Sequence, residues 1–275
     1  QPTTYVVYLN GKEIARTAET SYEATEEGAY TVKALYNIAG TEHISAASNT
    51  VASAQTAETA YDNVAQTFTN GGFRIPNVTS SSHGQLTLEF WIKPTQVKDW
   101  NQQIGGPWGT FLLHANSDGT MYYGWNTANR RQTDPILRVG KWTHIALVVN
   151  KNKATLYANG ASQGVLTTTS FSGFPAFSDG LLMGYDVNSS NALYGTIDEV
   201  RVWDVAKTGK QVRESYDRPI ASPATAKNLL AYLKMNTITE GGVKKLEDCA
   251  HGNHAIFINN NHRAATVESN ATIKH

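Results

Sequence analysis

Two neighbouring carboxylates, Asp198 and Glu199, lie in the strand-like segment 195–203 and are the first candidates for acid–base chemistry. A glycosidase-type reaction needs two carboxyl groups that act on one bond from a shared cleft. Adjacent side chains on a strand point to opposite faces, so this pair is not expected to act together. The alternation places Asp198 on one face with Val200 and Val202, and Glu199 on the other face with Arg201. A buried unpaired charge is costly, so Asp198 needs a partner.

The remaining catalytic patterns are absent from the sequence. Glu89 stands alone between Leu88 and Phe90 and is expected to pair with a basic neighbour such as Arg201. No Ser-His-Asp, Gly-x-Ser-x-Gly or phosphate-loop motif occurs. The single cysteine excludes an internal disulfide and is interpreted as a structural thiol. These observations favour binding over catalysis, and a glycoside hydrolase whose acids lie outside any recognisable motif remains the alternative.

Aromatic rings and planar polar side chains are the second kind of candidate, because together they suit carbohydrate binding. A Gly-rich loop, 98–108, contains two tryptophans that are expected outside strands. The residues expected to form a shallow sugar-binding face, provided that their loops share one rim, are Trp100, Trp108, Tyr122, Arg130, Tyr185 and Asn188. The tryptophans in strand-like segments are instead expected in the core: Trp91, Trp142 and Trp203, with Trp125 as a further candidate.

Composition narrows the possible partners. The 275 residues include 23 basic and 23 acidic side chains, so no electrostatic argument supports binding to nucleic acid or to an anionic membrane. No apolar run approaches the roughly 20 residues of a membrane-spanning helix, and no membrane insertion is expected. The chain opens on Gln1 without a basic and apolar leader, which predicts a cytosolic protein or a mature or excised piece of an exported one.

Short strands separated by turn residues dominate the rest of the chain and predict a two-sheet β-sandwich. Asn10-Gly11 predicts a hairpin between strands 5–9 and 12–15. Asn70-Gly71-Gly72 is interpreted as a turn within segment 68–75. Residues 207–216 form the only helix that the pattern predicts, about two turns long.

Four segments carry a family resemblance: 86–93, 141–149, 154–160 and 195–203. In this order they resemble the laminin-G-like, or concanavalin A-like, lectin domain in its bacterial and pentraxin-related form, over roughly residues 56–258. The resemblance implies an all-β jelly-roll sandwich. The tail from residue 228 is expected to close this single sandwich with edge strands, and a truncated second repeat is the alternative.

The N-terminal segment is expected to form a separate module. Residues 1–54 resemble the second half of a fibronectin type III or Ig-like domain, whose usual role is that of a spacer. Residues 52–60 are small and polar, which suits a linker. We therefore expect a partial fibronectin III/Ig-like β module over 1–54 and the lectin-like sandwich over 55–275.

The resemblance also carries expectations about ligands. Laminin-G-like domains often bind calcium at the sandwich rim, which implies Asp198 as the first side-chain ligand, with Asp62 and Asp186 as further candidates. The alternative is that Asp198 only accepts backbone N–H bonds and fixes a loop. The implied function is non-catalytic binding of a glycan or of a host or matrix glycoprotein by a secreted or cell-surface bacterial protein, with a possible catalytic domain elsewhere in the parent. A structural protein–protein module is a further alternative.

Overall fold

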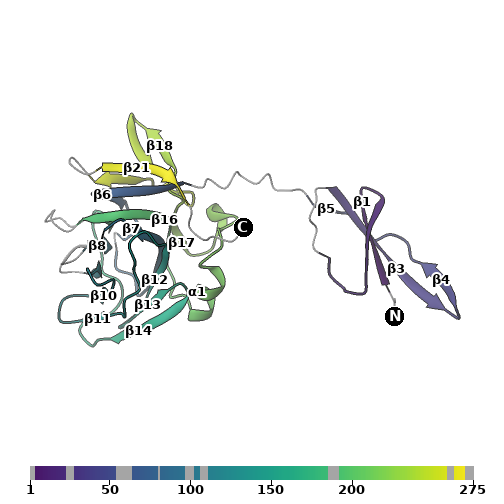
Figure 1. Cartoon of the computed structure of the whole chain (residues 1–275), viewed down its shortest axis with the longest axis horizontal. Helices are drawn as coiled ribbons and strands as arrows, with labels where there is room; N and C mark the ends of the chain where they lie inside the picture. The colour runs from purple at the N-terminus through teal and green to yellow at the C-terminus, as the bar shows by residue number, and fades with distance from the viewer. Residues whose placement is uncertain are drawn as a thin grey trace. The chain divides into compact units, whose positions relative to one another are not determined.

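The computed structural model describes residues 4–22, 28–53, 64–79, 81–96, 102–105, 111–184, 192–258 and 263–269. The chain divides into two compact units, Gln1–Asp62 and Asn63–His275 (Figure 1). Within the described ranges, no helix has the length and the apolar character that a membrane crossing requires.

The N-terminal unit is one antiparallel sheet in which β1 pairs with β2 and β3, and β3 pairs with β4 and β5. Its strands are β1 (Thr4–Leu9), β2 (Lys12–Thr17), β3 (Gly28–Ile38), β4 (Thr41–Ile44) and β5 (Val51–Ser53). The predicted hairpin joins β1 to β2, because Asn10 and Gly11 have φ angles of 51° and 82° and a tight hairpin turn of this kind needs positive φ at both positions.

The large unit is an all-β sandwich with two antiparallel layers. The first layer runs β16–β7–β12–β13–β14, and β17 pairs with the second half of β16. The strands of this layer are β7 (Gln85–Pro94), β12 (Thr143–Asn150), β13 (Lys153–Ala158), β14 (Ala161–Thr167), β16 (Leu193–Trp203) and β17 (Leu229–Leu233). The second layer runs β11–β10–β9–β8–β15; its strands are β8 (Gln102–Gly105), β9 (Leu112–Ala115), β10 (Met121–Gly124), β11 (Arg130–Gln132) and β15 (Leu181–Met183).

Strand β6 (Val64–Ile75) belongs to both layers, which corrects the prediction of a turn within it. Its first half pairs with β16, and its second half pairs with β15. Asn70, with a φ angle of 56°, lies where the strand passes from one layer to the other. At Gly72 a Cβ atom would collide with a backbone carbonyl of β15, so only glycine fits there. The Asn-Gly-Gly sequence therefore bends a continuous strand.

The C-terminal tail completes the same sandwich, as predicted. β17 pairs with β16, and β20 and β21 both pair with β6. The tail strands are β18 (Thr237–Glu240), β19 (Val243–Leu246), β20 (Ala255–Ile258) and β21 (Arg263–Glu268). The predicted helix is α1 (Gly209–Ser215), which Thr208 and Gln211 close with a reciprocal capping box. A short 3-10 turn, Pro223–Thr225, follows it.

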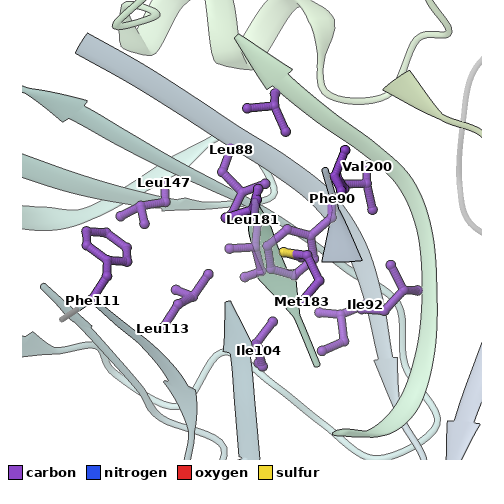
Figure 2. Packing of buried hydrophobic residues seen from close by; sticks show 14 of the residues in the cluster. Leu88, Phe90, Ile92, Ile104, Phe111, Leu113, Leu147, Leu181, Met183 and Val200 are labelled. Atoms are coloured by element: carbon purple, nitrogen blue, oxygen red, sulfur yellow. The ribbon is translucent and has the colours of Figure 1, made fainter. Parts of the chain in front are cut away.

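One hydrophobic core fills the space between the two layers. Figure 2 shows Leu88 and Phe90 of β7 facing side chains of the second layer such as Ile104 and Leu113. The prediction of core tryptophans is confirmed for Trp91 and Trp125, which are buried. It is wrong for Trp142 and Trp203, which are half-buried. Each of these two has a lysine ammonium over its ring, and Trp203 packs against a small hydrophobic cluster that lies outside the main core.

A β-bulge in β16 corrects the predicted alternation of its faces. The register with β7 shifts between Asp198 and Arg201, and Glu199 has a φ angle of 53°. The extra residue changes the alternation, so Val200 joins Ile197 in the core. Asp198 therefore does not share the core face with the valines.

Candidate functional site

The structure describes two of the six residues predicted to bind ligand, Tyr122 and Arg130. The other four lie outside the described residues, as do two of the three predicted metal ligands; these are Trp100, Trp108, Tyr185, Asn188, Asp62 and Asp186. Their predicted roles stay predictions. The geometry of a candidate site therefore begins from the hairpin of β10 and β11.

Tyr122 and Arg130 lie together on the outer face of the second layer. Met121 and Tyr123 point into the core, so Tyr122 between them points outwards. The guanidinium carbon of Arg130 lies 4.0 Å from the centre of the Tyr122 ring, which is a close cation–π contact. Both side chains are half-buried. The contact places the guanidinium directly beside the ring.

His114 and Gln132 extend this pair across three strands. Backbone register pairs Tyr122 with His114 on β9 and with Gln132 on β11. Burial, and next the positive charge of Arg130, lower the pKa of His114 to about 4. His114 is therefore a neutral imidazole at neutral pH, and it is 1% exposed, so it lies beneath the surface of this face. We call His114, Tyr122, Arg130 and Gln132 the polar row.

The polar row is suited to hydroxyl groups. A guanidinium presents a planar fork of N–H donors, and the Arg130 side chain forms no hydrogen bond to other described residues. The amide of Gln132 donates to Thr120 Oγ1 at 2.8 Å, which fixes its orientation. Sequence reasoning missed His114 and Gln132, because only the strand register places them beside Tyr122.

Asp198 is buried rather than exposed at a rim. It is 2% exposed; its Oδ1 accepts a bond from the Glu199 backbone N–H at 2.7 Å, and its Oδ2 accepts one from the Ser269 hydroxyl. Burial, and next the charge of Glu199, raise the pKa of Asp198 to about 8. Both oxygens thus accept hydrogen bonds from the protein, and the role of Asp198 as a metal ligand stays a prediction.

The described residues contain no group of three or more His, Cys, Asp or Glu side chains that could hold a metal ion. Asp248, another buried acid near a loop, accepts bonds from four backbone N–H groups, those of Tyr232, Ala250, His251 and Asn253. Such a carboxylate organises a loop. The calcium prediction, with Asp198, Asp62 and Asp186 as ligands, stays a prediction.

Glu89 pairs with Lys207 rather than with Arg201 as predicted. Lys207 Nζ lies 2.6 Å from Glu89 Oε1, and His144 Nε2 lies 3.6 Å from Glu89 Oε2. Burial is the largest single effect and opposes ionisation of Glu89, but the charge of Lys207, the other nearby charges and the hydrogen bond from Lys207 together outweigh it and lower the pKa of the carboxyl group. Burial also lowers the pKa of His144 to about 3, so this imidazole is neutral. The ammonium is therefore the charge that neutralises Glu89.

Arg201 forms the second buried ion pair of this layer. Its Nη2 donates to Glu199 Oε2 at 2.5 Å, and the Tyr232 hydroxyl donates to the same oxygen at 2.5 Å. Glu89 and Glu199 are fully enclosed, so neither carboxylate is exposed to a substrate. Both carboxylates act as paired structural charges, and removing one partner of such a buried pair lowers the stability of the protein.

The fold and the matching family agree. The chain belongs to the concanavalin A-like lectin/glucanases superfamily, whose laminin G family model matches residues 66–213. Among curated proteins, none matches the sequence significantly.

Solved structures share the fold at low sequence identity. A proposed carbohydrate-binding protein from Bacteroides ovatus is 20% identical, with a TM-score of 0.66 over 92% of this chain and 72% of its own. Domain 4 of the extracellular arabinanase AbnA from Geobacillus stearothermophilus, in complex with arabinotriose, is 18% identical, with a TM-score of 0.43 over 67% of this chain and 81% of its own. A SAP-like pentraxin from Limulus polyphemus is 16% identical, with a TM-score of 0.48 over 77% of this chain and 98% of its own.

Proposed function

We propose that the large unit is a non-catalytic carbohydrate-binding module of a secreted or cell-surface bacterial protein. The observation that carries the proposal is the guanidinium of Arg130 stacked on Tyr122 at 4.0 Å on the outer face of the sandwich. This arrangement offers a flat surface with a fork of donors, which suits the vicinal hydroxyls of a sugar ring. Membership of a superfamily of lectins and glucanases supports the same class of ligand.

A non-catalytic role is favoured by the state of the carboxylates. Glu89, Glu199 and Asp198 are each 2% exposed or less and engaged by hydrogen bonds or cations. A glycosidase needs two acids that reach one glycosidic bond. A hydrolytic activity of the parent protein would then belong to a catalytic domain elsewhere, and the partner of this module would be a glycan or a host or matrix glycoprotein.

A glycan array tests the proposal directly. The chain is screened in calcium and again in a chelator, which also tests the predicted calcium dependence. We expect one defined glycan class to bind, and incubation of that glycan with the chain to release no hydrolysis product. Product release would favour the glycoside hydrolase, and silence in both conditions would favour a structural or protein-binding module.

Two matched variants locate the site. Arg130→Ala removes both the stacking and the donors, so binding is expected to weaken about tenfold or more. Arg138→Ala removes the same charge from an exposed arginine outside the polar row and should leave affinity unchanged. Equal affinity in both variants would exclude the polar row as the glycan-binding site. Trp100→Ala and Trp108→Ala would then test whether the Gly-rich loop binds the glycan.

A further inference from the structure

A cavity of about 410 Å³ lies between β16 and the segment 207–220. Arg201 and Trp203 form its inner wall; they lie two residues apart on β16 and therefore share one face. Its mouth carries the exposed side chains of Gln211, Glu214 and Arg218. The volume falls in the range of small-molecule sites, roughly 300–1,000 Å³. The cavity is on the first layer, whereas the polar row is on the second.

Two buried donors at this cavity have no acceptor among the described residues. Arg201 is 1% exposed, and its Nη atoms donate to Glu199 and to the backbone carbonyls of Ser215 and Arg218. Its Nε is buried without a partner, and so is the Nε1 of Trp203. Both groups can only donate. A buried donor left unpaired costs about 1–3 kcal/mol, so an oxygen that reaches these groups recovers binding energy.

Charge balance at the cavity selects a neutral ligand over an anion. Arg201 is neutralised by Glu199 at 2.5 Å, and Lys207 by Glu89 at 2.6 Å. The exposed mouth adds one cation and one carboxylate. No excess positive charge is left to offset the free-energy cost of removing a carboxylate or phosphate ligand from water. The oxygen acceptors therefore belong to hydroxyl or ring-ether groups.

The remaining surface of the cavity fits a sugar. The oxygen of the Gln211 amide accepts from Thr208, and its nitrogen can donate to hydroxyls. Pro219 and Ile220 supply apolar area for the carbon face of a ring. We propose that this cavity is a second binding site, which takes one neutral sugar unit and receives two of its oxygens at Arg201 Nε and Trp203 Nε1. The choice of a sugar rests on the proposed function. Both donors are closed to solvent, so the entering ring displaces the long side chains at the mouth.

The indole N–H of Trp203 reports on this site directly. A panel of neutral methyl glycosides is titrated into the full chain, and the tryptophan indole signals are followed by ¹H–¹⁵N NMR. The Trp203 signal is identified by its loss in Trp203→Phe, which keeps an aromatic ring at this position and removes the donor. We expect a saturable shift of this signal with at least one glycoside, and at least fivefold weaker binding in Trp203→Phe by calorimetry.

Control variants separate the possible outcomes. Trp142→Phe alters the other half-buried, lysine-capped tryptophan and should leave affinity unchanged. A shift caused by acetate and by no neutral glycoside would overturn the ligand class. The absence of a saturable shift with any glycoside would overturn the site and leave bound water as the partner of the two donors. If glycosides shift the Trp203 signal but the glycan array shows no binding, the polar row is refuted as a binding site and the cavity is not.

Discussion

Replacing Asp198 by asparagine should make the large unit more stable at alkaline pH. The amide keeps an oxygen for the Glu199 backbone N–H and a partner for the Ser269 hydroxyl, but it cannot ionise. Burial raises the pKa of Asp198 from its ordinary value of 3.8 to about 8. The folded protein therefore binds a proton that the unfolded chain has released across this window, and the wild type loses stability as pH rises from about 4 to 8.

The size of the effect follows from these two values. Each pH unit within the window is worth about 1.4 kcal/mol, so the full span corresponds to roughly 5–6 kcal/mol. Between pH 5 and pH 8, the difference in unfolding free energy between Asp198→Asn and wild type should grow by about 3.5 kcal/mol in favour of the variant. The buried histidines His114 and His144 also titrate on unfolding, but their contributions cancel in this difference.

Urea unfolding followed by tryptophan fluorescence measures this quantity. All six tryptophans of the chain lie in the large unit, so the signal reports its unfolding alone. Asp179→Asn, which makes the same substitution at an exposed acid, is the control. A constant difference for Asp198→Asn from pH 5 to pH 8 would refute the raised pKa and the burial argument behind it.

Two further substitutions test the packing of the large unit. Lys207→Met removes the cation of a fully buried carboxylate, Glu89, so the unfolding free energy should fall by about 3–5 kcal/mol. The control is Lys210→Met, which removes an exposed ion pair with Glu214 at 3.8 Å and should change the unfolding free energy by less than about 1 kcal/mol. Equal effects of the two substitutions would contradict the role of the buried pair. Gly72→Ala places a Cβ atom against a backbone carbonyl and should lower the unfolding free energy by about 1–3 kcal/mol, whereas the Cβ atom of Gly84→Ala meets no atom within 4 Å. Thermal unfolding compares the two variants, and an unchanged Tm for Gly72→Ala would show that β6 and β15 are not packed as described.

Local patterns in the sequence predicted most of the fold. The Asn10-Gly11 hairpin, the alternating strands and the helix around α1 depend on backbone geometry and on nearest neighbours, so they can be read from short segments. Four such segments in order were specific enough to predict the superfamily, which the family model confirms. The same alternation was wrong for Asp198, because one inserted residue in β16 moves the side chains that follow to the other face.

Side-chain partners were decided by tertiary structure. Sequence reasoning paired Glu89 with Arg201, its neighbour across the strands, yet the chain returns after β16 and brings Lys207 to Glu89. The composition of the hairpin suggested Tyr122 and Arg130 as binding residues, while their stacking depends on the register of β10 against β11. The sequence by itself determines where most strands and turns form, because those preferences are local. Which charges meet, and which donors are left without acceptors, depends on residues far apart in the chain that only the folded sandwich brings together.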